Sequence, residues 1–449
     1  MTRTKVFFLI LTMAAPLYLT YLIYTYGVNV PYWDQWELVP IFEKLHSGQL
    51  TIYDLWNQHN EHRLLFPKLI MLALASITDW DIRYEFYANL VIAGITWFLL
   101  CLILQRSFGD NLPPWLLTAL SFLIFSPVQW ENWTWGWMIQ IFLTVSATVA
   151  AIWAINRWHD QLKGLIFAIA FAIIASYSFN TGLLTWVILI ILSVKQQRRW
   201  KQITLLFGAS VATTVLYYYN YIKPAHHPSL LYSIIHPCKF TMYVLAYLGL
   251  PLGRDRTSSI IIGLFILIVT TAAIIRIRQE NKREFDKLLP WIALSLYAFL
   301  SACATGVGRA GFGVGQALAS RYTTISNLSL ISALVIVTLW MQYHLNIQKN
   351  MTRRLNTYMR FILIILILAY AANFLHGIKK MARRSEKLQE AALCLSSDIQ
   401  KVPNESLEIL YPNAVIVRHR TKTLHDLRLS IFRDIKNPNL TKNNRQERL

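Results

Sequence analysis

The sequence predicts an all-α polytopic membrane protein with about eleven transmembrane helices. The 449 residues are 55% hydrophobic and 15% charged. Apolar runs such as residues 5–24 and 258–275 carry almost no charge and are long enough to cross a hydrocarbon core of about 30 Å. The formal net charge is +20, but the basic residues concentrate between the apolar runs. This is the positive-inside pattern of cytoplasmic loops, so the charge is poor evidence for a nucleic-acid partner.

The first apolar run follows Arg3 and Lys5 and lacks a small-residue cleavage site. It therefore predicts an uncleaved first span with the N-terminus in the cytoplasm. The expected spans are residues 5–26, 85–106, 114–130, 137–157, 163–179, 182–195, 201–221, 257–277, 288–305, 322–343 and 359–376. This arrangement places the basic loops on the cytoplasmic side and the C-terminus outside. Proline, glycine and histidine interrupt residues 236–256, and we expect that segment to be interfacial or re-entrant.

The predicted transmembrane domain covers residues 1–376. Its first extracytoplasmic loop, residues 27–84, contains two helix-like stretches at 37–48 and 62–79. Charge or glycine bounds these short stretches, so we expect them to lie along the outer membrane surface. Residues 377–449 are less hydrophobic. We expect them to form a small extracytoplasmic segment with a strand, a short helix and a disordered tail (KNPNLTKNNRQERL).

The stretch PYWDQWE follows the first span and places Asp34 and Glu37 among tryptophans. Tryptophan is common at membrane interfaces, but a carboxylate under aromatic rings is suited to accept a proton near neutral pH. Asp34 is therefore a candidate general base. The alternative role for Asp34 is to cap the surface helix that begins near Glu37.

The stretch HNEHR begins at His59 and places five polar or ionisable side chains directly before an apolar helix. In a helix, His59 and His62 share one face and can bind a divalent metal, although no third ligand is evident. Glu61 is a second candidate base, or else a partner of Arg63, whose planar guanidinium suits phosphate. Asn60 can cap the following helix.

The stretch QWENWTWGWMIQ is expected at the outer mouth of the third and fourth spans. Glu131 and Asn132 stand among four tryptophans, of which Trp133 follows them directly. Aromatic faces are good stacking surfaces for sugar rings and lipid tails. The alternative is an aromatic belt at the membrane interface.

Residues 305–324 contain five glycines and two arginines, Arg309 and Arg321. The glycines predict that no extended helix forms before about Gln316, and they allow the backbone to approach a ligand closely. Arginines in such a loop can clamp phosphate or diphosphate, and Tyr322 opens the next span beside them. The GK[ST] sequence of a Walker loop is absent. The alternative is a flexible hairpin whose arginines extend toward the membrane surface.

Together these four stretches resemble the GT-C superfamily of membrane glycosyltransferases, which use polyprenyl-phosphate-linked sugars. That superfamily includes the aminoarabinose transferase of lipid A and the protein O-mannosyltransferases. The resemblance implies that Asp34 is the catalytic carboxylate, that Glu131 is the acid of the second external loop, and that Arg309 or Arg321 holds the lipid phosphate. NEHR, WENWTWG and GRAGFG…SRY are also similar to poorly characterised bacterial membrane proteins of glycan loci.

The resemblance implies inverting transfer of a sugar from polyprenyl phosphate to a glycan, lipid or other acceptor, on the outer face of the bacterial cytoplasmic membrane. Asp34 is the expected base and Glu61 its rival, because the acids form Asp-x-x-Glu rather than an adjacent pair and HNEHR is not a general GT-C feature. The expected binding residues are Glu37, His59, His62, Arg63, Glu131, Asn132, Trp133, Arg309, Arg321 and Tyr322. The expected partners are the donor, the acceptor and membrane lipids, with no required metal or other cofactor.

Two other functions fit parts of the sequence. An O-antigen polymerase or ligase also uses arginines on lipid-linked diphosphates, but usually carries its largest external loop late in the chain, whereas here the first loop is the largest. A transporter or flippase of a lipid-linked sugar would place acids and arginines near the middle of its spans and would have paired halves with broken helices. The sequence shows no internal repeat.

Overall fold

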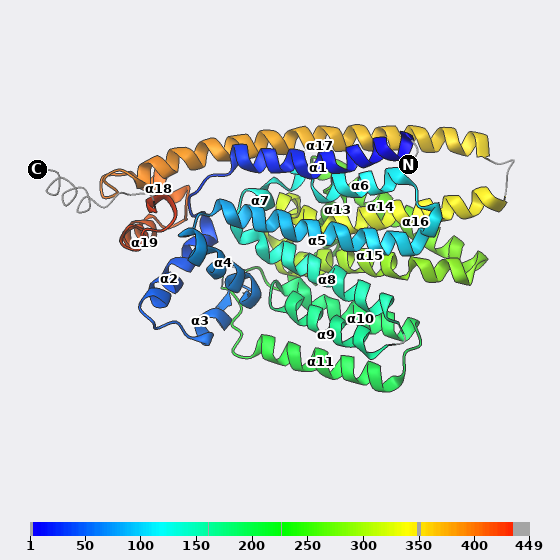
Figure 1. Ribbon diagram of the computed structural model, residues 1–449, viewed down its shortest axis with the longest axis horizontal. Coiled ribbons are helices and arrows are strands. Elements are labelled where there is room, and N and C mark those ends of the chain that lie inside the picture. The colour runs from blue at the N-terminus through cyan, green and yellow to red at the C-terminus, as the bar shows by residue number, and fades with distance from the viewer. Residues whose placement is uncertain (1–2, 160, 226, 348–351, 434–449) are drawn as a thin grey trace, which may run out of the picture.

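The computed structural model describes residues 3–159, 161–225, 227–347 and 352–433. Helices that run roughly along the long axis of the molecule make up nearly all of it (Figure 1). Within this described part, seven helical segments are long and apolar enough to cross a membrane: Arg3–Tyr26, Arg83–Asn111, Gly136–Arg157, Arg256–Glu280, Glu284–Phe312, Ser320–Tyr343 and Ile364–Leu395. The predicted all-α class is confirmed, and several helices have the length and composition expected of a multi-pass membrane protein. The count of about eleven spans stays a prediction.

Each of the long helices overlaps a predicted span. They are α1 (Arg3–Tyr26), α5 (Arg83–Phe108), α8 (Ile139–Arg157), α11 (Trp200–Tyr218), α14 (Arg256–Glu280), α15 (Lys282–Arg309), α16 (Thr323–Ile347) and α17 (Thr352–Leu395). The shorter helices of the bundle are α6 (Pro114–Ile124), α7 (Trp130–Trp133), α9 (Leu162–Ser176), α10 (Leu184–Lys195), α12 (Tyr232–Ile235) and α13 (Pro237–Gly249). Three predicted spans correspond to α6, α9 and α10, which have 11, 15 and 12 residues. At about 1.5 Å per residue, each of these three is shorter than a hydrocarbon core of about 30 Å.

The interrupted segment 236–256 contains α13, a helix of 13 residues that packs against α14. Two glycines allow the two backbones to meet. A Cβ atom on Gly249 would lie 1.9 Å from the carbonyl oxygen of Ser259, and one on Gly263 would lie 2.0 Å from that of Leu245. The segment is therefore a short helix held inside the bundle by close backbone contact.

Residues 27–84, which the sequence predicts to be the first external loop, form one end of the molecule (Figure 1). They contain α2 (Val39–His46), α3 (Ile52–Trp56), α4 (Leu65–Thr78) and two short strands, β1 (Gln58–His59) and β2 (His62–Arg63). Helices α2 and α4 lie within the two predicted surface helices. Helix α2 ends just before Gly48, which has a φ of 71° that suits glycine.

The C-terminal segment joins the same end of the molecule (Figure 1). Helix α17 runs beside α1 and has 44 residues, so the expected domain boundary after residue 376 falls inside a helix. Helices α18 (Asn404–Glu408) and α19 (Ala414–Asp426) follow and pack against each other, and α19 also packs beside α2. The prediction of a strand here is wrong: Asn413 caps residues 414–426 as a helix by accepting hydrogen bonds from two backbone N–H groups. The predicted disordered tail, residues 436–449, lies outside the described residues.

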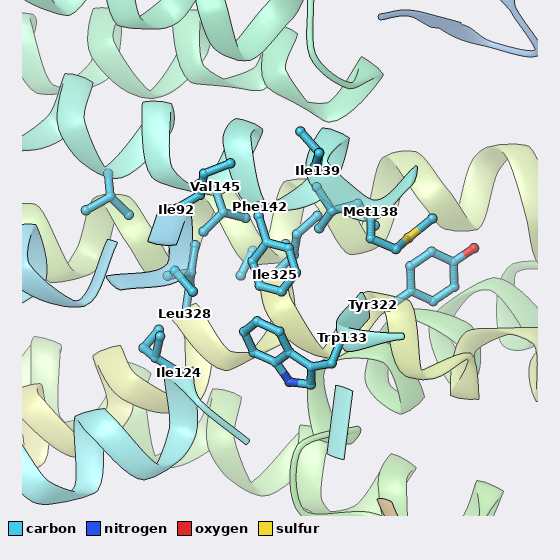
Figure 2. Close-up of a cluster of buried hydrophobic side chains, with 14 of the residues drawn as sticks. Ile92, Ile124, Trp133, Met138, Ile139, Phe142, Val145, Tyr322, Ile325 and Leu328 are labelled. Carbon is cyan, nitrogen blue, oxygen red and sulfur yellow. The ribbon is translucent and has the colours of Figure 1, made fainter. Parts of the chain in front are cut away.

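The core of the bundle lies between its central helices. Figure 2 shows one part of it, where Trp133, Phe142 and Ile325 point toward one another. Trp133 is fully buried, and its ring centroid lies 4.6 Å from that of Phe142. Its indole N–H donates a hydrogen bond to the carbonyl oxygen of Ser126 at 2.8 Å. Trp133 is therefore a core residue whose polar atom has a partner.

Candidate functional site

Most of the predicted site residues meet around one cavity of about 780 Å³, the first cavity. It lies where the predicted first external loop, the turn before α8 and the glycine-rich segment that begins at the end of α15 come together. Eight predicted residues line it: Asp34, His59, Glu61, His62, Glu131, Arg309, Arg321 and Tyr322. The aromatic side chains in its lining include Trp33, Trp135, Trp137, Phe179, Tyr218 and Tyr221.

The HNEHR stretch forms a β-hairpin rather than the start of a helix. Strands β1 and β2 pair antiparallel with His59 opposite His62, and Asn60 at the turn has a φ of 49°. Asparagine tolerates this left-handed conformation better than most residues, which favours a tight turn. Helix α4 begins only at Leu65 and has no side-chain cap. The predictions of a shared helical face for the two histidines and of a cap by Asn60 are therefore wrong.

Asp34 lies within a 3-10 helix, Trp33–Leu38, and does not cap it. Its side chain lines the first cavity and is 26% exposed. Its Oδ1 atom lies 3.4 Å from the Nε2 atom of His59, which is the one ion-pair contact of Asp34 in the part of the chain that the structure describes. The ring of His59 packs edge-on against that of Trp137, with centroids 4.9 Å apart. An accessible carboxylate with one basic neighbour can accept a proton.

Glu61 is more enclosed than Asp34, with 12% of its side chain exposed. Its carboxylate accepts a hydrogen bond from Arg309 and lies 3.5 Å from Nε2 of His62 and 3.4 Å from Nε2 of His227. Burial raises the pKa of Glu61, but His62 and Arg309 outweigh it and lower that pKa to about 2. Burial lowers the pKa of His62 to about 4. At neutral pH, Glu61 is thus an anion held by Arg309.

Glu131 and Arg321 form a second pair of opposite charges in the lining. Arg321 Nη1 lies 3.6 Å from Glu131 Oε1, while Glu131 Oε2 accepts hydrogen bonds from the Arg321 backbone N–H at 3.0 Å and the Ser320 hydroxyl at 3.1 Å. The guanidinium carbon also lies 5.3 Å from the ring centroid of Tyr322. A separation of 3.6 Å is longer than a charge-assisted hydrogen bond, so Arg321 keeps donors for an anion in the cavity.

The glycine-rich segment is more helical than predicted. Helix α15 continues through Gly306 and Gly308 to Arg309, and short 3-10 turns then lead to Tyr322. The prediction that no extended helix forms before Gln316 is wrong, because glycine inside a packed helix costs only about 1 kcal/mol, which tertiary contacts outweigh. Arg309 is therefore held at the end of a rigid helix rather than on a flexible loop.

Four predicted binding residues do not line the first cavity: Glu37, Arg63, Asn132 and Trp133. Arg63 is 3% exposed, and its guanidinium donates to the carbonyl oxygens of Tyr217 at 2.6 Å and Trp56 at 3.1 Å. It thereby joins the end of α11 to the first external loop. Asn132 is buried and donates to the carbonyl oxygen of Arg321 at 3.0 Å, so it supports a residue that does line the cavity.

Glu37 links the first external loop to the C-terminal segment. Its carboxylate accepts hydrogen bonds from Arg420 on α19 and from the Tyr411 hydroxyl, both at 2.8 Å. Burial raises the pKa of Glu37, but these two partners outweigh it and hold that pKa below its ordinary value. Asp81 makes a parallel link, with Oδ2 lying 2.6 Å from Nη1 of Arg433.

Arg384 on α17, which the sequence analysis did not identify, packs against two aromatic rings that share the cavity lining with Asp34. It is 9% exposed, and its guanidinium carbon lies 4.2 Å from the ring centroid of Tyr32 and 5.7 Å from that of Trp135, two rings that line the first cavity. Trp33, with a φ of 49°, donates its backbone N–H to the carbonyl oxygen of Leu410, just after α18, at 2.6 Å. The C-terminal segment therefore holds both residues before Asp34.

Gln35, directly after Asp34, is a second support that sequence reasoning missed. It is 1% exposed, and its Nε2 donates to Glu85 Oε2 at 2.7 Å while its Oε1 accepts from the Tyr32 backbone N–H at 3.2 Å. Gly136 packs on this bond, since a Cβ there would lie 1.9 Å from the Glu85 carboxylate. A glutamate at the start of a predicted span is the signal that could have drawn attention to Glu85.

Among the described residues, no group of three or more histidine, cysteine, aspartate or glutamate side chains is arranged to hold a metal ion. His59 and His62 turn to different partners: His59 faces Asp34, while His62 stacks on Phe179 with ring centroids 4.1 Å apart. The two histidines thus contribute to the wall of the cavity through separate contacts.

Comparison with known proteins identifies no function. No protein-family model matches the chain, and no solved structure matches it. An uncharacterized protein from Archaeoglobus fulgidus is 28% identical over an alignment of 226 residues that covers 48% of this chain and 54% of that protein. The chain thus spans about half the length of this relative. The first cavity is therefore the feature of this chain from which a function can be proposed.

Proposed function

We propose that the protein transfers a sugar from a polyprenyl-phosphate carrier to a hydroxyl acceptor at the outer face of a cell membrane, as a glycosyltransferase of the GT-C type. The observation that carries the proposal is that one cavity contains an accessible carboxylate, Asp34, and two arginines, Arg309 and Arg321, within aromatic walls. An acid that accepts a proton, cations that hold a phosphate and rings that stack on a sugar are the parts that this reaction needs.

Asp34 is a better base than Glu61 in this geometry. Glu61 is held by Arg309 and has a pKa of about 2, so it has little tendency to take a proton from a hydroxyl near neutral pH. Asp34 is more exposed, and His59 is its one ion-pair partner within the described residues. In the proposed reaction, Asp34 takes the proton of the acceptor hydroxyl, and Glu61 keeps Arg309 in place.

Arg321 is the first candidate for holding the carrier phosphate. Its contact with Glu131 is 3.6 Å and 27% of its side chain is exposed, whereas Arg309 is bound directly by Glu61. A guanidinium that faces a cavity offers paired donors to phosphate oxygens. Arg309, at the end of α15, adds a second positive charge on the same lining.

In the proposed step, every bond, proton and electron pair is accounted for without a cofactor. The acceptor oxygen forms a bond to the anomeric carbon as the bond from that carbon to the phosphate oxygen breaks, and the proton of the acceptor passes to Asp34. The polyprenyl phosphate leaves with the electron pair, and the charge that develops on it is stabilised by Arg321 and Arg309. Attack opposite the leaving group inverts the anomeric centre.

A transporter of a lipid-linked sugar is the alternative that the sequence left open. In this conformation, packed side chains fill the middle of the helices that run inward from the first cavity: Val149 on α8 and both Leu294 and Tyr297 on α15 are fully buried. The charged groups of the cavity come from the hairpin, from short 3-10 turns, from loops and from helix ends, and none of them lies in this middle region. This arrangement favours chemistry at one face over passage through the bundle.

The proposal is tested with purified protein in nanodiscs that contain polyprenyl-phosphate-linked sugars with a radioactive label and an added acceptor glycan. We expect label to leave the lipid fraction and enter the acceptor, and Arg321→Gln to lower the rate by about 10-fold or more. The matched control is Arg254→Gln, an exposed arginine before α14 that does not line the cavity. Movement of label between leaflets without loss from its carrier would indicate a transporter instead.

A further inference from the structure

A second cavity of about 780 Å³ lies at the opposite ends of helices that form the first cavity. Helix α8 contributes Ile141 to the first cavity and Arg157 to the second, and at about 1.5 Å per residue these positions are about 24 Å apart. Helices α10 and α15 likewise contribute one end to each cavity. Lys195 and Lys287, two residues of its lining, belong to the basic segments that the positive-inside pattern predicts to be cytoplasmic.

Four cations from four different helices line the second cavity: Arg106, Arg157, Lys195 and Lys287. Asp286 is the one acid in its described lining. Lys287 pairs with Glu284 at 2.7 Å. The side chains of Arg157 and Lys195 make neither a hydrogen bond nor an ion pair with other described residues.

Basic residues at helix C-termini have an ordinary explanation, because they complement the helix dipole and orient the chain in the membrane. That explanation does not require them to converge on a cavity. Here the ends of α5, α8 and α10 bring Arg106, Arg157 and Lys195 around one space, and α15 adds Lys287 from its first turns. The convergence concentrates positive charge on a concave surface.

The rest of the lining combines apolar and neutral polar groups. Leu102, Ile103, Trp153, Leu289 and Pro290 supply the apolar part, and Gln105, Asn156 and Gln197 add amide side chains. A free inorganic anion gains nothing from an apolar wall, whereas a molecule with an anionic head and hydrocarbon chains can use both parts. Basic pockets between helices on the cytoplasmic side of membrane proteins are suited to anionic lipid headgroups.

We propose that the second cavity binds the phosphate headgroup of an anionic phospholipid from the inner leaflet. Arg157 and Lys195 contact the phosphate oxygens, Arg106 and Lys287 add to the positive potential, and the first segments of the acyl chains lie against the apolar lining. This site is separate from the first cavity and does not depend on the proposed transfer reaction. The bound lipid would join the inner ends of α5, α8, α10 and α15.

Native mass spectrometry of the purified full chain, titrated with phosphatidylglycerol or phosphatidylcholine of the same acyl chains, tests this site. We expect the wild type to bind phosphatidylglycerol at least about 10-fold more tightly. The double variant Arg157→Gln/Lys195→Gln should lose that preference. The matched control is Lys163→Gln/Arg199→Gln, which removes one lysine and one arginine from exposed positions next to the same helices but outside the cavity lining. The control should keep the preference.

Equal binding of the two lipids by the wild type would overturn the proposal, and this comparison needs no variant to fold. Equal loss in the two double variants would also overturn it, because it would show a general effect of surface charge. A third titration adds inorganic diphosphate in millimolar excess to the phosphatidylglycerol complex. Retention of the lipid supports a lipid site, and its displacement would show a site for free phosphate groups instead.

Discussion

The imidazole of His59 and the carboxylate of Asp34 meet in the lining of the first cavity, with Nε2 of the histidine 3.4 Å from Oδ1 of the aspartate. The two residues reach this point from different elements, a β-hairpin and a 3-10 helix. Trp137 packs edge-on against the histidine ring, with the ring centroids 4.9 Å apart. His59 can therefore orient the carboxylate that we propose as the base.

Replacement of His59 by alanine should lower sugar transfer by about 10-fold. This loss is smaller than the roughly 10²- to 10⁴-fold that removal of a general base costs, because Asp34 remains. The measurement compares the transfer rates of equal amounts of wild type, His59→Ala and His59→Gln. We expect the rate of His59→Gln to lie between those of the wild type and His59→Ala. His419→Ala, at an exposed position on α19, serves as the control. Full activity in His59→Ala would remove the histidine from the mechanism.

The pair formed by Glu61 and Arg309 should behave as a structural unit. Arg309→Gln leaves the enclosed Glu61 without its cation, and we expect a loss of about 2 kcal/mol in the free energy of unfolding, less than for a fully buried pair. The double variant Glu61→Gln/Arg309→Gln should recover part of that loss, because no charge is left unpaired. Thermal unfolding of the two single variants and the double variant measures the coupling. Additive effects would contradict the role we give to this pair.

Arg384 should influence transfer although it does not line the cavity. Arg384→Leu removes the cation beside the rings of Tyr32 and Trp135, and a desolvated cation–π contact contributes about 2 kcal/mol. We expect transfer to fall by about 10-fold, with partial recovery in Arg384→Lys. Arg383→Leu, at the exposed neighbouring position on α17, is the matched control. If both leucine variants lose the same activity, the contact with the rings is not the cause.

The contact between Glu37 and Arg420 should stabilise the protein in a pH-dependent way. The folded protein holds the pKa of Glu37 below the ordinary value of 4.5. The ionised carboxylate therefore stabilises the fold fully at a pH above 4.5, and this stabilisation is lost as the pH falls through the lowered pKa. We expect Glu37→Gln to melt below the wild type at pH 7, and the difference to close as the pH falls below 4.5. Glu43→Gln, at an exposed position on α2, should show no such closure. A difference for Glu37→Gln that stays constant over this range would contradict the assignment.

Helix positions could be predicted closely where an apolar run of full length identifies them. Helix α5 extends two residues beyond the predicted span 85–106 at each end, and α14 lies within three residues of 257–277. The meeting of Asp34, Glu131 and Arg321 also follows from the sequence, because spans that alternate in direction bring these segments to one face. Burial of apolar surface determines both the helix positions and the meeting of these segments, and the apolar runs in the sequence show directly which segments carry that surface.

Pairwise contacts could not be predicted in the same way. Glu61 bonds to Arg309, which is 248 residues away, and Glu37 bonds to Arg420, which is 383 residues away. One sequence does not say which of many basic side chains an acid will meet. The hairpin of HNEHR was missed for a local reason: its polar residues fit a helix start as well as a turn, and the left-handed backbone of Asn60 decided the outcome.

The central claim is that Asp34 is the base of a sugar transfer, and substitution of its carboxylate tests it most directly. The measurement compares sugar incorporation into the surface glycan of cells that produce equal amounts of wild type, Asp34→Asn and Asp79→Asn. Asp79 is an exposed control in the same loop, with a φ of 50° that asparagine also tolerates. We predict a loss of about 100-fold or more for Asp34→Asn and none for Asp79→Asn. Normal incorporation by Asp34→Asn would contradict the account.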